Sequence, residues 1–143
     1  MYHVVTAVDD DREQAAELAE TVGRLAEEAD LKVTLVHVFR NADVSQRVAI
    51  YRIADDYEEQ LEEGRDVPVA VRETLDRLAG AEFDLEFRIE SGDPAEEILR
   101  VADEADADAV HVGGRKRSPV GKALVGSVAQ DVIFSTSLPV LIG

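Results

Sequence analysis

One stretch of the sequence decides the fold: residues 108–127 read DAVHVGGRKRSPVGKALVGS. Its first five residues, DAVHV, end in a Val-His-Val segment, and we expect them to form a short strand of a parallel sheet. Two glycines follow directly, and Gly126-Ser127 then precedes an apolar segment that we expect to be helical. A glycine-containing loop between a strand and a helix can point backbone N–H groups and a hydroxyl at an anion.

The charge of this stretch is opposite to that of the chain. The 143 residues include 31 acidic and 15 basic side chains, which gives a net charge of −16. No acidic residue lies between Ala109 and Gln130. Four of the basic residues fall in this window, namely Arg115, Lys116, Arg117 and Lys122. We interpret the window as a cradle for a polyphosphate, which the rest of the molecule would repel. The alternative is an ordinary loop whose basic side chains pair with acidic neighbours.

Strand and helix patterns alternate along the chain on both sides of this stretch. Apolar or alternating runs predict strands at 3–8, 32–39, 83–89, 108–112 and 138–142. Helical patterns cover 12–30, 45–63, 69–78, 94–105 and part of 120–134. Strands separated by helices favour right-handed βαβ units and a parallel sheet. We therefore predict one α/β domain over residues 1–143, in which the two helices within 45–78 form an insertion over the sheet edge.

Two groups of polar residues have competing interpretations. Residues 9–11, Asp-Asp-Asp, offer N-cap oxygens to the first helix, while Mg²⁺ binding near Asp11 is the second interpretation. His3, His37 and His111 lie on three different predicted strands, with no carboxylate at ligand spacing. We expect them to be core or edge histidines rather than a metal site or a catalytic base. No nucleophile elbow, dinucleotide fingerprint or Walker loop is present, so we expect a binding protein rather than an efficient enzyme.

Over essentially its whole length the chain resembles the universal stress protein family. The resemblance rests on the strand ending at Val8-Asp9, the Leu35-Val36-His37-Val38 strand, the Gly92-Asp93-Pro94 turn and the segment from Gly126 through Ile142. It implies a three-layer doubly wound sandwich whose five-stranded parallel sheet has the strand order 3-2-1-4-5. The order puts the topological switch between strands 1 and 4, and ligands bind at such a switch beyond the carboxyl ends of the strands. The inferred cradle lies at the same place.

The resemblance also implies a set of nucleotide-binding residues. ATP-binding members carry a Gly-x2-Gly-x9-Gly-Ser/Thr signature, which Gly113, Gly126 and Ser127 match, but Lys116 stands at the second glycine. Lysine adopts a positive φ less readily than glycine, and its side chain needs space where phosphates approach the backbone. Its ammonium group either contacts the phosphates or the side chain blocks them.

By the same resemblance, Asp9 and the backbone of Val38 would hold adenine, and the three matching signature residues would hold ribose and phosphates. Lys116 and Val128 would line the same pocket. The expected cofactor is ATP or another adenine nucleotide, with Mg²⁺ as a possible companion and no metal site of the protein's own. Family members pair the last strand across a two-fold axis, which implies a homodimer through residues 138–142.

Composition restricts the remaining function classes. The acidic surface repels nucleic acid and anionic membranes, and we expect neither as a partner. The first residues read as a strand rather than a signal peptide, and no apolar run reaches the ~18 residues of a membrane span. Together with the absence of cysteine, these features lead us to expect a cytoplasmic protein. A net charge of −16 also suggests adaptation to high salt, as in a halophile.

Three functions remain open. The first is a stress-response regulator that binds an adenine nucleotide and hydrolyses it slowly at most. The second, which the Lys116 substitution favours, is a universal stress protein without nucleotide binding that acts as a dimeric interaction module for an unknown protein partner. The third is an enzyme of a related α/β nucleotide-binding superfamily, for which no residue names a substrate.

Overall fold

The computed structural model describes residues 1–40, 47–52, 68–78, 83–113, 115–117 and 123–143, with the backbone alone for 47–52, 115–117 and 123–125. The chain begins with β1 (Tyr2–Ala7), α1 (Arg12–Glu28), β2 (Leu31–Phe39) and β3 (Arg47–Arg52). It continues with α3 (Val69–Leu78), β4 (Asp84–Ser91), α4 (Pro94–Glu104) and β5 (Ala109–Val112). The last elements are β6 (Arg115–Arg117), β7 (Ala123–Val125), α5 (Ser127–Ser135) and β8 (Val140–Ile142).

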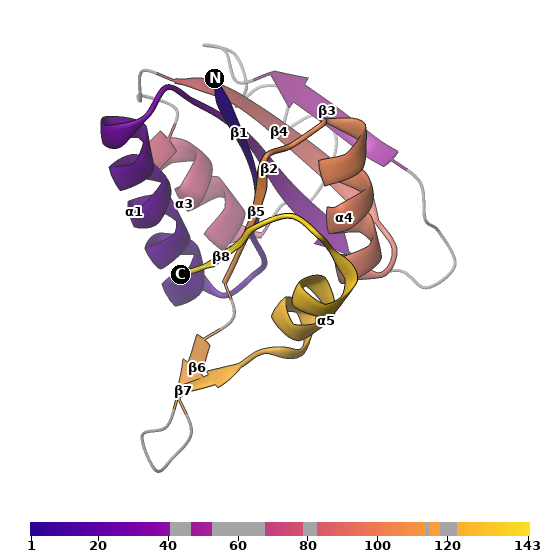
Figure 1. The fold of residues 1–143 in the computed structure, drawn as a ribbon. Coiled ribbons are helices and arrows are strands. Elements are labelled where there is room, and N and C mark those ends of the chain that lie inside the picture. Colours follow the sequence, from indigo (N-terminus) through magenta and orange to yellow (C-terminus); the bar gives the residue numbers. More distant parts are fainter. Residues whose placement is uncertain (41–46, 53–67, 79–82, 114, 118–122) are drawn as a thin grey trace.

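Five parallel strands form the centre of the fold, in the order β4-β2-β1-β5-β8. This is the order 3-2-1-4-5 of the predicted strands, so the predicted fold class is confirmed. Helices α1 and α3 cover one face of the sheet and α4 and α5 cover the other (Figure 1). Because β1 has β2 on one side and β5 on the other, the carboxyl ends of these three strands meet at the switch point.

The prediction of a helix over 45–63 is wrong where the structure describes this segment. Residues 47–52 form β3, which pairs antiparallel with β4 and extends the sheet at that edge. Val48, Ile50 and Tyr51 are β-branched or aromatic, which favours a strand, and the edge of β4 supplies the backbone partners. The rest of the predicted helix lies outside the described residues.

Strands β6 and β7 form a second element that the sequence pattern does not predict. They pair antiparallel, with Lys116 opposite Leu124. The acid-free window therefore leaves the sheet as a two-stranded ribbon before it enters α5 (Figure 1).

Two helix starts near the switch point follow from their capping residues. The carboxylate of Asp11 accepts hydrogen bonds from the backbone N–H groups of Glu13 and Gln14, at 3.0 and 3.1 Å. Asp93 caps α4 in the same way and Pro94 takes its first turn, as the sequence predicts. The preceding Gly92 has a φ of 138°, which only glycine adopts without strain, and its N–H donates to the carbonyl oxygen of Phe39.

None of the helices in the described ranges is long and apolar enough to cross a membrane.

Candidate nucleotide-binding site

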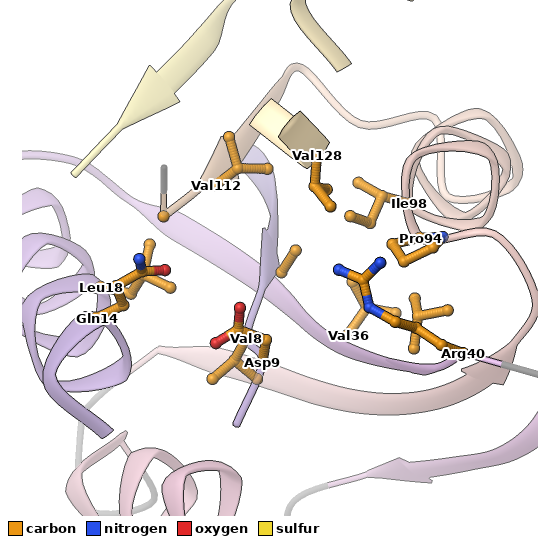
Figure 2. A pocket seen from close by; sticks show the side chains of 13 residues that line it. Val8, Asp9, Gln14, Leu18, Val36, Arg40, Pro94, Ile98, Val112 and Val128 are labelled. Carbon is orange, nitrogen blue, oxygen red and sulfur yellow. The ribbon is translucent and has the colours of Figure 1, made fainter. Parts of the chain in front are cut away.

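A pocket with a volume of about 70 Å³ opens where β1, β2 and β5 end. The lining residues come from the strand ends, α1, α4 and α5 (Figure 2), and are Ala7, Val8, Asp9, Gln14, Leu18, Val36, Val38, Arg40, Pro94, Ile98, Val112, Gly113 and Val128. Most of them are apolar, and Asp9 and Arg40 are the charged ones. An apolar pocket with a few polar groups at fixed places is the usual form of a small-molecule site.

The exit of β1 into Asp9 is held by hydrogen bonds on both sides of Val8. The N–H of Val8 donates to the carbonyl oxygen of Val36 at 2.9 Å, and Nδ1 of His37 donates to the carbonyl oxygen of Val8 at 2.8 Å. Asp9 then accepts a hydrogen bond from the backbone N–H of Asp11 at 2.9 Å. The position of the Asp9 carboxylate therefore follows from the strand pairing and from the turn into α1.

Gly113, directly after β5, packs closely against helix α1. A Cβ atom at this position would lie 3.1 Å from Oε1 of Gln14 and 3.4 Å from Cδ1 of Leu18. The first distance is tighter than an ordinary van der Waals contact, so a side chain here would push against α1. The absence of a side chain keeps the pocket open between the helix and the end of β5.

Helix α5 begins beside the pocket without a side-chain cap. Gly126 is the N-cap residue, Ser127 begins the helix, and the N–H of Gln130 donates to the carbonyl oxygen of Gly126 at 3.0 Å. Ser127 is exposed and Val128 lines the pocket. The first N–H groups of a helix carry a partial positive charge, and an anion next to them is stabilised.

The seven residues that the sequence analysis predicts divide into three groups. Asp9, Val38, Gly113 and Val128 line the pocket. Gly126 and Ser127 precede Val128 at the start of α5. Lys116 is the central residue of β6, and its side chain lies outside the described residues.

Sequence reasoning missed several other lining residues, including Gln14, Leu18, Arg40, Pro94 and Ile98. Three of them carry a weak sequence signal. Gln14 and Leu18 are four residues apart on α1 and therefore share one face of that helix. Arg40 follows β2 directly and lies at the same edge of the sheet as Asp9.

The histidines occupy the core. Nε2 of His3 lies 2.7 Å from Oγ1 of Thr34, and Nδ1 of His111 lies 3.3 Å from Oγ1 of Thr6. Burial is the main cause that lowers the pKa of His3 and of His37 and that lowers the pKa of His111 to about 4. All three rings are therefore neutral at pH 7.

The acidic residues that follow β1 mainly serve the local backbone. Asp11 caps α1, and Asp9 accepts the hydrogen bond from the N–H of Asp11. Within the part of the chain that the structure describes, no group of three His, Asp or Glu side chains has the arrangement of a metal site.

Residues 1–142 match the sequence model described as the universal stress protein family. The chain belongs to this family. A universal stress protein of Mycolicibacterium smegmatis is 47% identical over 49 residues, which span 34% of this chain and 38% of that relative. A universal stress protein of Archaeoglobus fulgidus with a solved structure is 29% identical, with a TM-score of 0.64, over 99% of this chain and 98% of the other.

Two further solved structures contain nucleotides. A universal stress protein in complex with cAMP is 22% identical, with a TM-score of 0.64, over 99% of this chain and 95% of that one. The Archaeoglobus fulgidus universal stress protein in complex with dAMP is 23% identical, with a TM-score of 0.62, over 99% and 97% of the two chains. At these identities the likeness to this chain is one of fold.

Proposed function

We propose that this universal stress protein is a stress-response regulator that binds ATP or another adenine nucleotide where β1, β2 and β5 end. The observation that carries the proposal is the apolar pocket itself, with a carboxylate at Asp9, a side-chain-free wall at Gly113 and an uncapped helix start beside it. The adenine nucleotides bound by two structural neighbours support the same ligand class.

Each predicted residue has a chemical role in this proposal. The Asp9 carboxylate accepts a hydrogen bond from the exocyclic amine of adenine, and the backbone of Val38 pairs with the same edge of the base. Gly113 leaves room for the ribose, while Gly126, Ser127 and Val128 offer N–H and hydroxyl donors to phosphates. The Lys116 side chain either adds a positive charge to the phosphate site or blocks it, and Mg²⁺ accompanies ATP on its phosphates near Asp11.

We propose binding with at most slow hydrolysis rather than efficient catalysis. A general base must reach the reacting group and hold a suitable pKa. The three histidines lie in the core, and burial favours the neutral form of each ring without bringing any of them into the pocket lining.

The first test is whether protein purified without added nucleotide retains ATP. In calorimetric titrations at fixed salt, we expect Gly126→Glu to abolish binding, because its carboxylate would take the space of a phosphate and repel it. We expect Ser127→Ala to weaken binding less, by about 1.5–3 kcal/mol for one hydrogen bond to a charged group. Circular dichroism and light scattering check that both variants stay folded and in the same oligomeric state. The proposal is wrong if the wild type binds no adenine nucleotide at millimolar concentration.

Lys116→Gly restores the family signature and separates the two roles of this side chain. We expect weaker ATP binding if the ammonium group contacts phosphate, and tighter binding if the side chain blocks the site. An unchanged affinity would remove Lys116 from the proposed site.

The second candidate function is a dimeric interaction module for an unknown protein partner. The Lys116 substitution favours it, and so do the apolar residues beside the edge strand β8, since Phe134 is 84% exposed and Ile133 39% exposed in the single chain. We propose a homodimer through β8 in either case, because an uncovered apolar edge strand promotes aggregation. A monomeric mass by light scattering at high salt would exclude the dimer. A single domain, a cytoplasmic location and the absence of nucleic-acid and membrane partners belong to the same proposal.

A further inference from the structure

Arg40 is a charged residue of the pocket that no family signature in the sequence identifies. It follows β2 directly, and its side chain lines the pocket together with Val36, Val38 and Pro94. Figure 2 shows its guanidinium group pointing into the pocket, toward the side chains of Val36 and Pro94. Gln14 and Leu18 bound the opposite side of the same pocket. Arg40 is exposed and lines the pocket, so a ligand that enters the pocket can reach its guanidinium group.

The ionic surroundings of Arg40 differ from those of four other arginines. Arg12, Arg24, Arg88 and Arg100 each form an ion pair with glutamate. For Arg40, no carboxylate among the described residues lies within ion-pair distance. Arg72 and Arg77 of α3 likewise have no ion pair among the described residues, but Arg40 lines the pocket and they do not. Arg40 is therefore available to a ligand that enters the pocket.

The place of Arg40 in the sheet favours contact with the base rather than with phosphates. Arg40 continues β2, whereas Gly113 continues β5, and β1 lies between these two strands. Neighbouring strands are about 4.8 Å apart, so the two positions are separated by roughly 10 Å of backbone. The proposed phosphate donors follow from the β5 side, and the Asp9 carboxylate and the Val38 backbone, both proposed for the base, lie on the β1 and β2 side.

We propose that Arg40 is a specificity-determining residue of the pocket and stacks its guanidinium plane on the face of the bound purine. The inference rests on the proposed function, because it assigns a role within that same site. The apolar side chains of Val36 and Pro94 support one face of this stack and the guanidinium group supplies the other. Arginine is suited to this role, since its planar group stacks on aromatic rings and remains charged at all relevant pH values.

The test compares two ligands that differ only by the phosphate. Adenosine and AMP are titrated calorimetrically, at one salt concentration, into the full-length wild type and the Arg40→Ala variant. Stacking predicts that Arg40→Ala weakens the binding of both ligands by the same factor, roughly three- to tenfold. A loss for AMP with no loss for adenosine would instead assign Arg40 to the phosphate and overturn the proposal. Equal affinities of variant and wild type would also overturn it.

Two further variants separate shape from charge. Arg40→Lys keeps the positive charge but not the plane, so we expect it to recover only part of the affinity. Full recovery would overturn stacking and leave a simple charge effect. Arg24→Ala is the matched control, because it removes the same charge from an exposed arginine of α1 that pairs with Glu20, and we expect it to leave both affinities unchanged. If the wild type binds neither ligand, the proposed function fails together with this inference. If the wild type binds both ligands and Arg40→Ala binds them equally well, the inference about Arg40 fails but the proposed function stands.

Discussion

Both faces of the sheet pack apolar side chains against their helices, but strand β4 contributes different residue types to the two faces. Leu85, Phe87 and Ile89 alternate onto the face covered by α1 and α3, where they join an entirely apolar cluster. Arg88 and Glu90 alternate onto the opposite face, where α4 covers them. Arg88 is 4% exposed and Glu90 is fully buried, so this strand buries charge on one side and hydrocarbon on the other.

The charged side chains beneath α4 form one connected network. Glu90 accepts from the guanidinium groups of Arg88 and Arg100, each at 2.8 Å. Arg100 also pairs with Glu97 at 2.5 Å and with Glu104 at 2.9 Å. Arg88 closes the network on Glu104 at 2.6 Å, and this hydrogen bond is the main cause that lowers the pKa of the Glu104 carboxyl group.

Apolar contacts and buried ion pairs contribute differently to this fold. Burying apolar area is favourable by about 25 cal/mol per Å², whereas the desolvation of a buried ion pair offsets most of its Coulombic gain. We infer that the apolar clusters, which lie on both faces of the sheet, supply most of the stability of the fold. The charged face fixes how α4 lies on the sheet, since each carboxylate accepts hydrogen bonds in one arrangement. The start of α4 contributes Pro94 to the pocket, so this arrangement also bears on the site.

The largest expected effect comes from breaking the apolar face. Phe87 is fully buried among α1, α3 and the sheet, and Phe87→Ala should cost about 3–5 kcal/mol through lost burial and the cavity left behind. Urea unfolding followed by circular dichroism measures this change. Phe134→Ala is the control, because it removes the same ring from a side chain that is 84% exposed in the single chain. A cost below about 1 kcal/mol for Phe87→Ala would contradict the assignment of stability to the apolar clusters.

Breaking the charged face should cost less. Glu90→Gln removes the central carboxylate and places an amide N–H₂ group beside guanidinium donors, and we expect a loss of about 2–4 kcal/mol. Since the network is buried, the loss should persist in molar KCl. Glu86→Gln makes the same change four residues earlier on β4, where the side chain is half-buried, and should stay within about 0.5 kcal/mol. If Glu90→Gln stabilises the protein, the carboxylate of Glu90 is not needed to hold α4 on the sheet.

The sequence predicts the elements of this fold better than their partners. The Gly92-Asp93-Pro94 turn identifies the start of α4 because caps and φ preferences are local. The alternation of apolar and charged residues in β4 identifies a strand for the same reason. Arg88 and Glu90 can be buried because they pair with Glu104 and Arg100 of helix α4. No local sequence pattern predicts these ion pairs. Likewise, β3 was missed because its strand state depends on the edge of β4.

The site follows the same division. Asp9 and Gly113 could be placed in the pocket from topology, since each directly follows a strand that ends at the switch point. Arg40 also follows a strand, but nothing in the sequence distinguishes an arginine that points into a pocket from one that pairs with a surface carboxylate. Gln14 enters the lining only because Gly113 lets α1 approach β5.

The smallest effect should distinguish the two faces by pH. His37 and His111 lie on the apolar face, where His37 makes an edge-on contact with Phe39 at 4.8 Å between ring centroids. Burial lowers the pKa of His111 from 6.5 to about 4. Between these two pH values His111 is therefore protonated in the unfolded chain but neutral in the folded chain. The stability that this group contributes is therefore fully present above pH 6.5 and is lost as the pH falls toward 4. Between pH 7 and pH 5 the loss amounts to about 2 kcal/mol.

Replacing His111 by phenylalanine isolates this contribution. His111→Phe removes the titrating ring together with Nε2, which has no hydrogen-bond partner among the described residues. We expect its free energy of unfolding to fall less steeply between pH 7 and pH 5 than that of the wild type, with a residual slope from His3 and His37, whose pKa values burial also lowers. Glu90→Gln should keep the wild-type slope in this range, because it leaves all three buried histidines in place. Urea unfolding at pH 7, 6 and 5 measures all three slopes. Equal slopes for wild type and His111→Phe would show that acid sensitivity in this range does not arise from His111, whereas a flattened slope in Glu90→Gln would assign it to the charged face.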